Sequence, residues 1–414
     1  MERILGIIAE YNPFHNGHFY HMQEAKRVTN AEYCVCVVSG NFTQRGEPSI
    51  INKWSKAYMA LCCGADLIIE LPTIYSTSSA ENFASGAIKI LNSLKIVTDV
   101  AFGTECNDIA TLNNIANVVY SEPKEYKNIL NHELKRGLSY PSARENAIMM
   151  YLNDIKRYAN VMASSNNILA IEYLKALKAQ KSRINPIAIK RNKVYYNDET
   201  IVDGLASATA IRKFLARKEY ADVRKVVPRS TYQILGEEIK KGEIILSIKD
   251  FEKEIIYNLR KMSIEEIANL PDVSEGLEYS IKRAAEESND INEIIEKIKS
   301  KRYTQTRIQR ILIYSLLNIN KKDMQNSKNI IPYTRILGFN QRGRMLLSEI
   351  VRENPKINMI TSVGKYVKQD AKKANKQLIQ MLSTDIFATN VYTLGYKNDA
   401  KANLDFTNNM IIIK

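Results

Sequence analysis

The sequence predicts an α/β fold in which a parallel β-sheet with crossover helices is followed by a mainly helical, basic C-terminal part. Up to about residue 200, short apolar runs alternate with amphipathic helical patterns, as strands and helices do in a parallel sheet. From Thr231 onward strand patterns become rare and charged helical periodicity takes over. With 414 residues, 45% hydrophobic and 25% charged, the chain can form two or three domains, and collagen-like or wholly disordered proteins are excluded.

The N-terminal part, residues 1–225, is expected to hold five buried strands. Apolar runs place them at 4–9, 33–38, 67–71, 97–102 and 186–189. Helical patterns lie between the strands, at 17–28, 54–63, 82–91 and 168–178. Because parallel strands end at one edge of a sheet, a ligand site is expected in the loops that follow them.

The C-terminal part, residues 226–414, is expected to form a second domain. A linker-like stretch at 192–206 and an amphipathic helix near 208–217 precede the boundary. The end of the chain is ambiguous, because 388–396 and 405–413 also fit strands.

The expected location of the protein is the cytoplasm. No apolar run approaches the ~20 residues of a membrane-spanning helix, and the first residues lead into a strand pattern without a signal peptide. The five scattered cysteines fit neither a disulfide framework nor a zinc site.

The net charge of +14 is concentrated in the last quarter of the chain. Residues 301–414 hold 20 Lys and Arg but 7 Asp and Glu, whereas the preceding residues are nearly balanced. Such a basic segment favours a polyanionic partner, because each neutralised phosphate releases counterions. A basic face that only keeps the protein soluble is the alternative.

Three of the four histidines, His15, His18 and His21, follow directly after the first predicted strand. Pro13 ends the strand, and Gly17 lets the backbone approach a ligand closely. His15 and His18 can therefore face one anion at the N-terminus of the next helix. Two alternatives stay open, namely histidines that cap the helix and a metal site with His21 as third ligand.

Polar residues also follow the later strands. Gly103 comes after the fourth strand, where it would let the chain pass beneath an adenosine. Asn166 and Asn167 open a helix, as a cap or as nucleotide ligands, and Arg191 ends the fifth strand.

A small-residue run ends in a second phosphate-binding pattern. Ser207 and Thr209 stand at a predicted helix N-terminus, and Arg212 lies one turn further on. Hydroxyls and a guanidinium at that position can hold phosphate oxygens together. A surface role for Arg212 is the alternative.

His15-Asn-Gly-His18 resembles the HxGH signature of the nucleotidylyltransferase superfamily, and residues 207–212 resemble its second signature, S-(S/A)-T-x-I-R. The resemblance implies a Rossmann-like, HUP-type ATP-binding domain. It also implies that the two histidines contact ATP phosphates and stabilise the charge that develops as pyrophosphate leaves.

Further segments, taken in order, resemble the bacterial tRNA(Met) cytidine acetate ligase family over nearly the whole chain. They are residues 10–21, 39–48, 65–72, 102–105, 166–167, 207–212, 301–310 and 333–339. Two departures concern local loop shape. Ser165 and Ala170 stand in a segment that usually reads Pro-Asn-Asn-Ile-Leu-Gly, and Asn192 follows Arg191 where a small residue is usual.

This resemblance implies an ATP-dependent ligase with acetate and elongator tRNA(Met) as its other substrates. Acetate would attack the α-phosphate of ATP to give acetyl-adenylate, and N4 of the wobble cytidine would then take the acetyl group to form N4-acetylcytidine. Acetate is ionised at pH 7, so the first step requires no general base. The implied catalytic residues are His15, His18 and Arg212. The implied ATP-binding residues are Ile7, Ile8, Ala9, Glu10, Tyr11, Asn12, Pro13, Phe14, Asn16, Gly17, Phe19, Tyr20, Gly103, Asn166, Asn167, Arg191, Ser207 and Thr209.

The basic stretch after residue 300 is expected to bind RNA. Residues 301–350 hold 10 Lys and Arg but 2 Asp and Glu. Arg302, Arg307 and Arg310 are expected to contact phosphates, and Tyr303 can stack on an unpaired base. A solvated helix is the alternative.

Two other functions share these motifs: a small-molecule adenylyltransferase of cofactor biosynthesis, and a non-enzymatic RNA-binding protein on a nucleotide-binding fold. The first would leave the basic C-terminal region without a task, and the intact His15, His18 and Arg212 argue against the second. The sequence leaves open the oligomeric state, the residues that select acetate and the tRNA, the base for acetyl transfer, and whether Mg²⁺ assists the phosphates.

Overall fold

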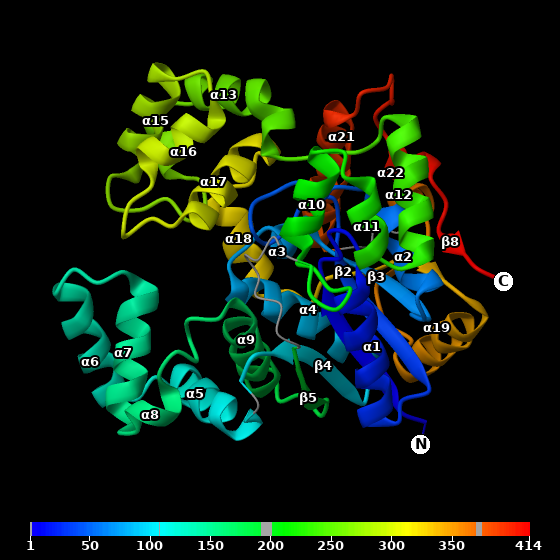
Figure 1. Cartoon of the computed structure of the whole chain (residues 1–414), viewed down its shortest axis with the longest axis horizontal. Coiled ribbons are helices and arrows are strands. Elements are labelled where there is room, and N and C mark those ends of the chain that lie inside the picture. The colour runs from blue at the N-terminus through cyan, green and yellow to red at the C-terminus, as the bar shows by residue number, and fades with distance from the viewer. Residues whose placement is uncertain (1, 107, 192–200, 370–374) are drawn as a thin grey trace.

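The computed structural model describes residues 2–106, 108–191, 201–369 and 375–414, and its centre is a mixed eight-stranded sheet flanked by helices (Figure 1). The strands run in the order β5-β4-β1-β2-β3-β6-β7, with β8 beside β6. Their bounds are β1 Ile4–Ala9, β2 Tyr33–Ser39, β3 Leu67–Leu71, β4 Asp99–Thr104, β5 Asn185–Lys190, β6 Thr334–Phe339, β7 Met359–Ile360 and β8 Ile411–Ile412.

The five predicted N-terminal strands are confirmed, and the parallel sheet they form explains their continuous apolar runs. Successive residues point to opposite faces, so that Val35 and Val37 join one core while Cys34 and Cys36 join the other. The strand predicted at 97–102 begins two residues later, at Asp99. Val97 is apolar and buried like a strand residue, but it lies in the loop before β4.

The N-terminal helices cover both faces of the sheet. Those predicted at 17–28, 54–63, 82–91 and 168–178 are found as α1, α2, α4 and α9. Helices α5 to α8, which follow β4 and precede β5 in the chain, were not predicted, and α6 to α8 project from the rest of the molecule (Figure 1). The bounds are α1 Asn16–Thr29, α2 Lys53–Cys62, α3 Thr73–Ser76, α4 Ala80–Leu94, α5 Ile109–Ser121, α6 Lys124–Lys135, α7 Tyr140–Leu152, α8 Ile155–Tyr158, α9 Ser165–Ala179, α10 Ala208–Ala216, α11 Tyr220–Val226 and α12 Arg229–Lys241.

The C-terminal part is mainly helical, as predicted, and α13, α15 and α16 form a second projection (Figure 1). None of the described helices combines the length and the apolar character needed to cross a bilayer. The bounds are η1 Ile248–Phe251, α13 Glu252–Lys261, α14 Ile264–Ala268, α15 Leu277–Glu287, α16 Ile291–Ile298, α17 Gln305–Leu317, α18 Lys321–Lys328, α19 Gln341–Glu353, α20 Val363–Gln369, α21 Lys376–Tyr392, η2 Thr393–Gly395 and α22 Leu404–Thr407.

Three strands of the C-terminal part return to the N-terminal sheet, which makes the sheet mixed rather than purely parallel. β6 pairs antiparallel with β3, while β7 and β8 pair parallel with β6. The sheet thus contains strands from both sides of the boundary predicted between residues 225 and 226. The division into two domains stays a prediction, and residues 192–200 of the predicted linker lie outside the described part of the chain.

The tail differs from the strand interpretation. Residues 388–396 form the end of α21 and the short helix η2, because apolar residues of α21 such as Leu378, Met381 and Leu382 recur at helical spacing and are buried. Residues 405–413 form α22 and the two-residue strand β8.

Candidate active site

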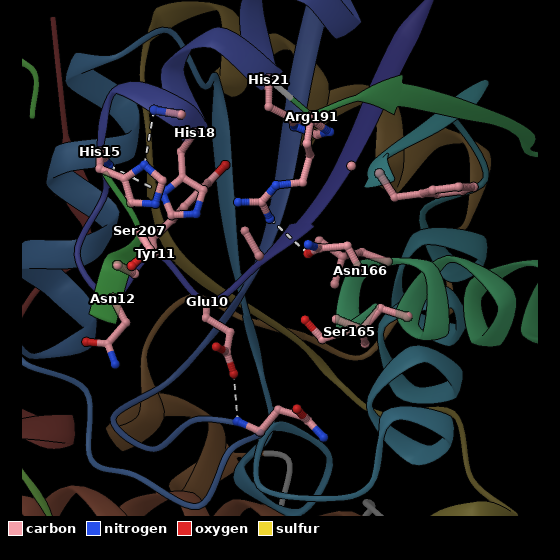
Figure 2. Close-up of a pocket in the computed structure, with 18 of the residues that line it drawn as sticks. Glu10, Tyr11, Asn12, His15, His18, His21, Ser165, Asn166, Arg191 and Ser207 are labelled. Carbon is pink, nitrogen blue, oxygen red and sulfur yellow. Dashed lines mark hydrogen bonds between the residues drawn. The ribbon is translucent and has the colours of Figure 1, made fainter. Parts of the chain in front are cut away.

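A cavity of about 390 Å³ opens at the carboxyl ends of β1 and β4, where ligands bind in sheets of this kind. Its walls come from the loop after β1, α1, the loop after β2, the start of α9, the end of β5 and the start of α10. Figure 2 shows His15 and His18 on one wall, Arg191 and Asn166 on the opposite one, and Glu10 between them.

His15 and His18 are held by the backbone of the first turn of α1. His15 is the N-cap, and its Nδ1 accepts the N–H of Gly17 at 3.0 Å. The N–H of His15 donates to Nδ1 of His18 at 3.3 Å, and the rings stack with centroids 3.8 Å apart. Because both Nδ1 atoms accept, each neutral ring carries its proton on Nε2. The helix-cap alternative and the anion-site hypothesis are therefore compatible.

The two imidazoles are neutral at pH 7. Burial, together with Arg191 and Arg212, lowers the pKa of His15 to about 3. Burial and the neighbouring His15, Arg191 and His21 hold the pKa of His18 well below its usual value. A neutral imidazole with a fixed Nε2–H can donate a hydrogen bond to phosphate without first losing a water shell around a charge.

Gly17 is required by this arrangement, and His21 stands apart from it. A Cβ at Gly17 would lie 2.9 Å from Cε1 of His15, so a larger residue would push the ring away.

Burial and Arg191 lower the pKa of His21 to about 4, although a hydrogen bond to the Phe102 backbone opposes them. In the part of the chain that the structure describes, no three His, Cys, Asp or Glu residues are grouped as a metal site, so the three-histidine alternative finds no support.

The wall opposite the histidines is a connected polar network. Arg191 donates to Oδ1 of Asn166 at 2.9 Å, and Nδ2 of Asn166 donates to Glu105. Asn167 points elsewhere, since its Oδ1 accepts the backbone N–H of Glu105 at 3.0 Å and shapes that loop. A Cβ at Gly103 would lie 3.1 Å from Cγ of Arg191, so the chain and the arginine pass closely here.

Arg212 joins three segments at the edge of the cavity. Its guanidinium donates to the carbonyl of Asn12 at 3.0 Å, to Glu47 at 3.1 Å and to the hydroxyl of Thr209 at 3.4 Å. Ser207 is the N-cap of α10, and its hydroxyl accepts a backbone N–H of the first turn at 3.0 Å. The surface interpretation of Arg212 is wrong, because its side chain is 13% exposed.

The structure brings most of the predicted site residues together. The cavity is lined by Ile7, Ile8, Ala9, Glu10, Tyr11, Asn12, His15, Gly17, His18, Tyr20, Gly103, Asn166, Arg191, Ser207 and Arg212. Other predicted residues do not line it, namely Pro13, Phe14, Asn16, Phe19, Asn167 and Thr209. The individual roles in binding ATP stay predictions.

The residues outside the lining support it or face solvent. Phe14 is buried against the rings of Tyr11 and His18. Asn16 donates to the backbone carbonyl of Gly204 at 2.9 Å, which ties α1 to the segment before α10. Phe19 is 41% exposed.

The loop after β2 was expected to border the ligand site, like the loops after the other strands, but none of its residues was predicted as a site residue. Thr43, Gln44, Arg45 and Glu47 of this loop line the cavity. The available signal was polar residues directly after a buried strand, at the edge where ligands bind.

The three arginines predicted to bind RNA all interact with other groups of the protein. Arg310 is buried and forms an ion pair with Asp272 at 2.7 Å. Arg307 donates to the carbonyl of Asp272 at 2.7 Å and lies over the ring of Tyr303. Arg302 is exposed and pairs with a surface glutamate at 2.9 Å. Arg307 and Arg310 share a helix face and both bind Asp272, although Arg307 stays partly exposed. Their role in RNA binding stays a prediction.

The fold and the histidine site together define a nucleotidyltransferase. The HIGH Nucleotidyl Transferase family model matches residues 2–406. The crystal structure of apo Thermotoga maritima TmcAL is similar over 99% of both chains, with a TM-score of 0.94 and 33% identity. The same protein bound to alpha-thio ATP gives a TM-score of 0.93, also over 99% of both chains and at 33% identity.

Curated relatives show to which family of nucleotidyltransferases the chain belongs. The tRNA(Met) cytidine acetate ligase of Acetivibrio thermocellus is 44% identical over 99% of this chain and 100% of its own length. The enzyme of the same name from Clostridium perfringens is 40% identical over 99% of this chain and 100% of its own. The chain belongs to the tRNA(Met) cytidine acetate ligase family.

Proposed function

We infer that this chain is an ATP-dependent ligase that activates acetate as acetyl-adenylate and transfers the acetyl group to N4 of the wobble cytidine in elongator tRNA(Met). The observation that carries this function is the pair of neutral Nε2–H donors at the N-terminus of α1, of which His15 is buried and His18 half-buried, in a chain that matches the family over its full length. Neither a small-molecule adenylyltransferase nor a non-enzymatic RNA-binding protein accounts for that match.

In the first step an acetate oxygen attacks the α-phosphorus of ATP, and the bond to the β-phosphate oxygen breaks. His15, His18 and Arg212 supply donors for the charge that moves onto pyrophosphate, and Ser207 places the N-terminus of α10 at the same cavity. Mg²⁺ commonly binds ATP through phosphate oxygens, and we propose that it enters with the nucleotide.

The acetyl group then travels as a mixed anhydride with AMP rather than on the protein. Among the described residues that line the cavity there is no cysteine; of the serines there, Ser207 caps α10 and the hydroxyl of Ser165 accepts a hydrogen bond from Arg45. An acyl-enzyme would need a nucleophile paired with a base. The cytoplasm, where ATP and tRNA meet, is the proposed location.

The reaction itself is tested with purified protein, ATP, acetate and unmodified elongator tRNA(Met). We expect N4-acetylcytidine at the wobble position, with AMP and pyrophosphate as products and no requirement for acetyl-CoA. With uridine at that position acetyl transfer should be abolished, because uridine has no exocyclic amine, while acetyl-adenylate still forms. ADP and phosphate as products, or adenylylation of a small cofactor precursor in place of tRNA modification, would contradict the proposal.

We propose that tRNA contacts the exposed cations just before α17, beside the cavity. Thr306 at the start of α17 lines the cavity, and Lys301 and Arg302 precede it with exposed side chains. Replacing both by alanine should weaken tRNA binding and reduce its log–log salt slope by about one unit per lost phosphate contact. The measurement is tRNA affinity across a salt series.

The matched control for this prediction is Arg344→Ala with Arg352→Ala. Both residues are exposed on α19, and Arg352, like Arg302, pairs with a surface glutamate. This control should keep the affinity and slope of the unmodified protein. Equal losses in the two double variants would show that only overall charge matters.

A further inference from the structure

Glu10 differs from the other carboxylate in the cavity. Two carboxylates line the cavity in the described part of the chain, Glu10 and Glu47. Glu47 forms an ion pair with Arg212 at 3.1 Å. Glu10 forms no ion pair with any residue that the structure describes, although the cavity also holds Arg45 and Arg191. A carboxylate acceptor without an ion-pair partner among the described residues thus lies in a site whose cations suit phosphates.

The carboxylate of Glu10 has a fixed orientation. Its Oε1 accepts the backbone N–H of Gln44 at 2.7 Å, and Figure 2 shows it directed away from His15 and His18. That bond turns it toward the loop after β2, whereas Gly103 and Arg191 belong to β4 and the end of β5 on the other side of β1. Glu10 therefore faces the half of the cavity away from Arg191 and from Gly103, the predicted adenosine contact.

The hydrogen-bonding groups of the substrates decide which of them the carboxylate of Glu10 can bind. An ionised carboxylate only accepts hydrogen bonds, and acetate and the phosphates of ATP are negatively charged acceptors that it repels. Cytosine presents an N4 amine, which is a donor that Glu and Asp side chains recognise. We propose that Glu10 binds the N4 amine of the acceptor cytidine and takes its proton during acetyl transfer, an inference that rests on the proposed function.

Acetyl transfer to N4 conserves atoms and charge. The N4 lone pair forms a bond to the acetyl carbonyl carbon, and the bond between that carbon and the phosphate oxygen breaks. AMP leaves with the electron pair, and one N4 proton passes to the carboxylate of Glu10. Glu10 is partly exposed, so the proton then reaches water.

The test separates the two half-reactions in Glu10→Gln, which keeps the size of the side chain but removes its basicity. Acetyl-adenylate formation is measured without tRNA, and transfer is measured in a single turnover after tRNA is added. We expect the transfer rate to fall about 100-fold or more relative to acetyl-adenylate formation. Glu10→Asp, which retains a carboxylate, should recover part of the loss. Glu47→Gln is the matched control, because losing the partner of Arg212 should slow the first step without a selective loss of transfer.

Equal slowing of both steps in Glu10→Gln would overturn the inference and assign Glu10 to ATP or to its Mg²⁺. If neither the transfer rate nor the rate of acetyl-adenylate formation changes in Glu10→Gln, the inference is overturned too. Failure of the unmodified protein to form acetyl-adenylate or to acetylate tRNA would instead overturn the proposed function, so the two failures are distinguishable.

Discussion

Replacing His15 or His18 by alanine should lower the rate of acetyl-adenylate formation by about 100-fold or more, the scale of a lost donor to developing charge. Each ring presents one Nε2–H, because its Nδ1 is occupied by a backbone N–H. Alanine removes that donor and leaves no side chain that can replace it. The measurement is pyrophosphate release from ATP and acetate without tRNA.

His132→Ala is the matched control for these variants. His132 lies on α6 with a side chain 70% exposed, and it is the one histidine of the four that is not in the 10–21 segment. Its replacement should leave pyrophosphate release unchanged. Near-normal release by either the His15 or the His18 variant would remove these residues from the mechanism.

The lowered pKa values also predict how the first step responds to pH. The pKa of His15 is about 3, so its ring stays neutral as the pH falls from 8 to 5, and burial lowers the pKa of His18 too. Protonation of His15 would begin only below that range. We therefore expect kcat/KM for ATP, which reports groups of the free enzyme, to show no titration of His15 between pH 5 and 8. A titration near pH 6.5 that disappears in His15→Ala would contradict the assignment.

Local sequence patterns predicted the parts of the fold that depend on near neighbours. Strands β1 to β4 are largely buried on both faces and β5 is a partly buried edge strand, so each appears as an apolar run. Pro13 and Gly17 mark the turn that places His15 at the start of α1. The histidine site could be found because its donors, its cap and its glycine lie within a few residues of one another.

Contacts between distant segments were beyond local patterns. β6 adds to β3 across more than half of the chain, and nothing near residues 334–339 indicates which strand it will join. Arg310 and Arg335 counted as surface charge, yet each is buried against an acid elsewhere in the sequence, Asp272 and Asp405 respectively. Charge counts locate an excess of cations but not the partners that the fold brings to them.

The second large effect is expected at a buried ionic cluster that joins the C-terminal part to the sheet. Lys53 on α2 lies 3.0 Å from Glu70 on β3 and 2.7 Å from Asp405 on α22. Arg335 on β6 lies 3.1 Å from Glu70 and also pairs with Asp405. The two cations and two anions balance, and all four side chains are at most 5% exposed. Removing one member leaves an uncompensated charge in the interior.

Arg335→Met should therefore lower the free energy of unfolding by about 3–5 kcal/mol, as for other buried ion pairs that lose one partner. The measurement is the urea midpoint at an unchanged slope, and Asp405→Asn in the same chain should recover part of the loss by removing the stranded anion. Arg302→Met is the matched control, since its ion pair is exposed and water can solvate the glutamate left behind. Similar midpoints for Arg335→Met and Arg302→Met would contradict the prediction. The cost arises from desolvation rather than from the number of contacts, so only the buried arginine should show it.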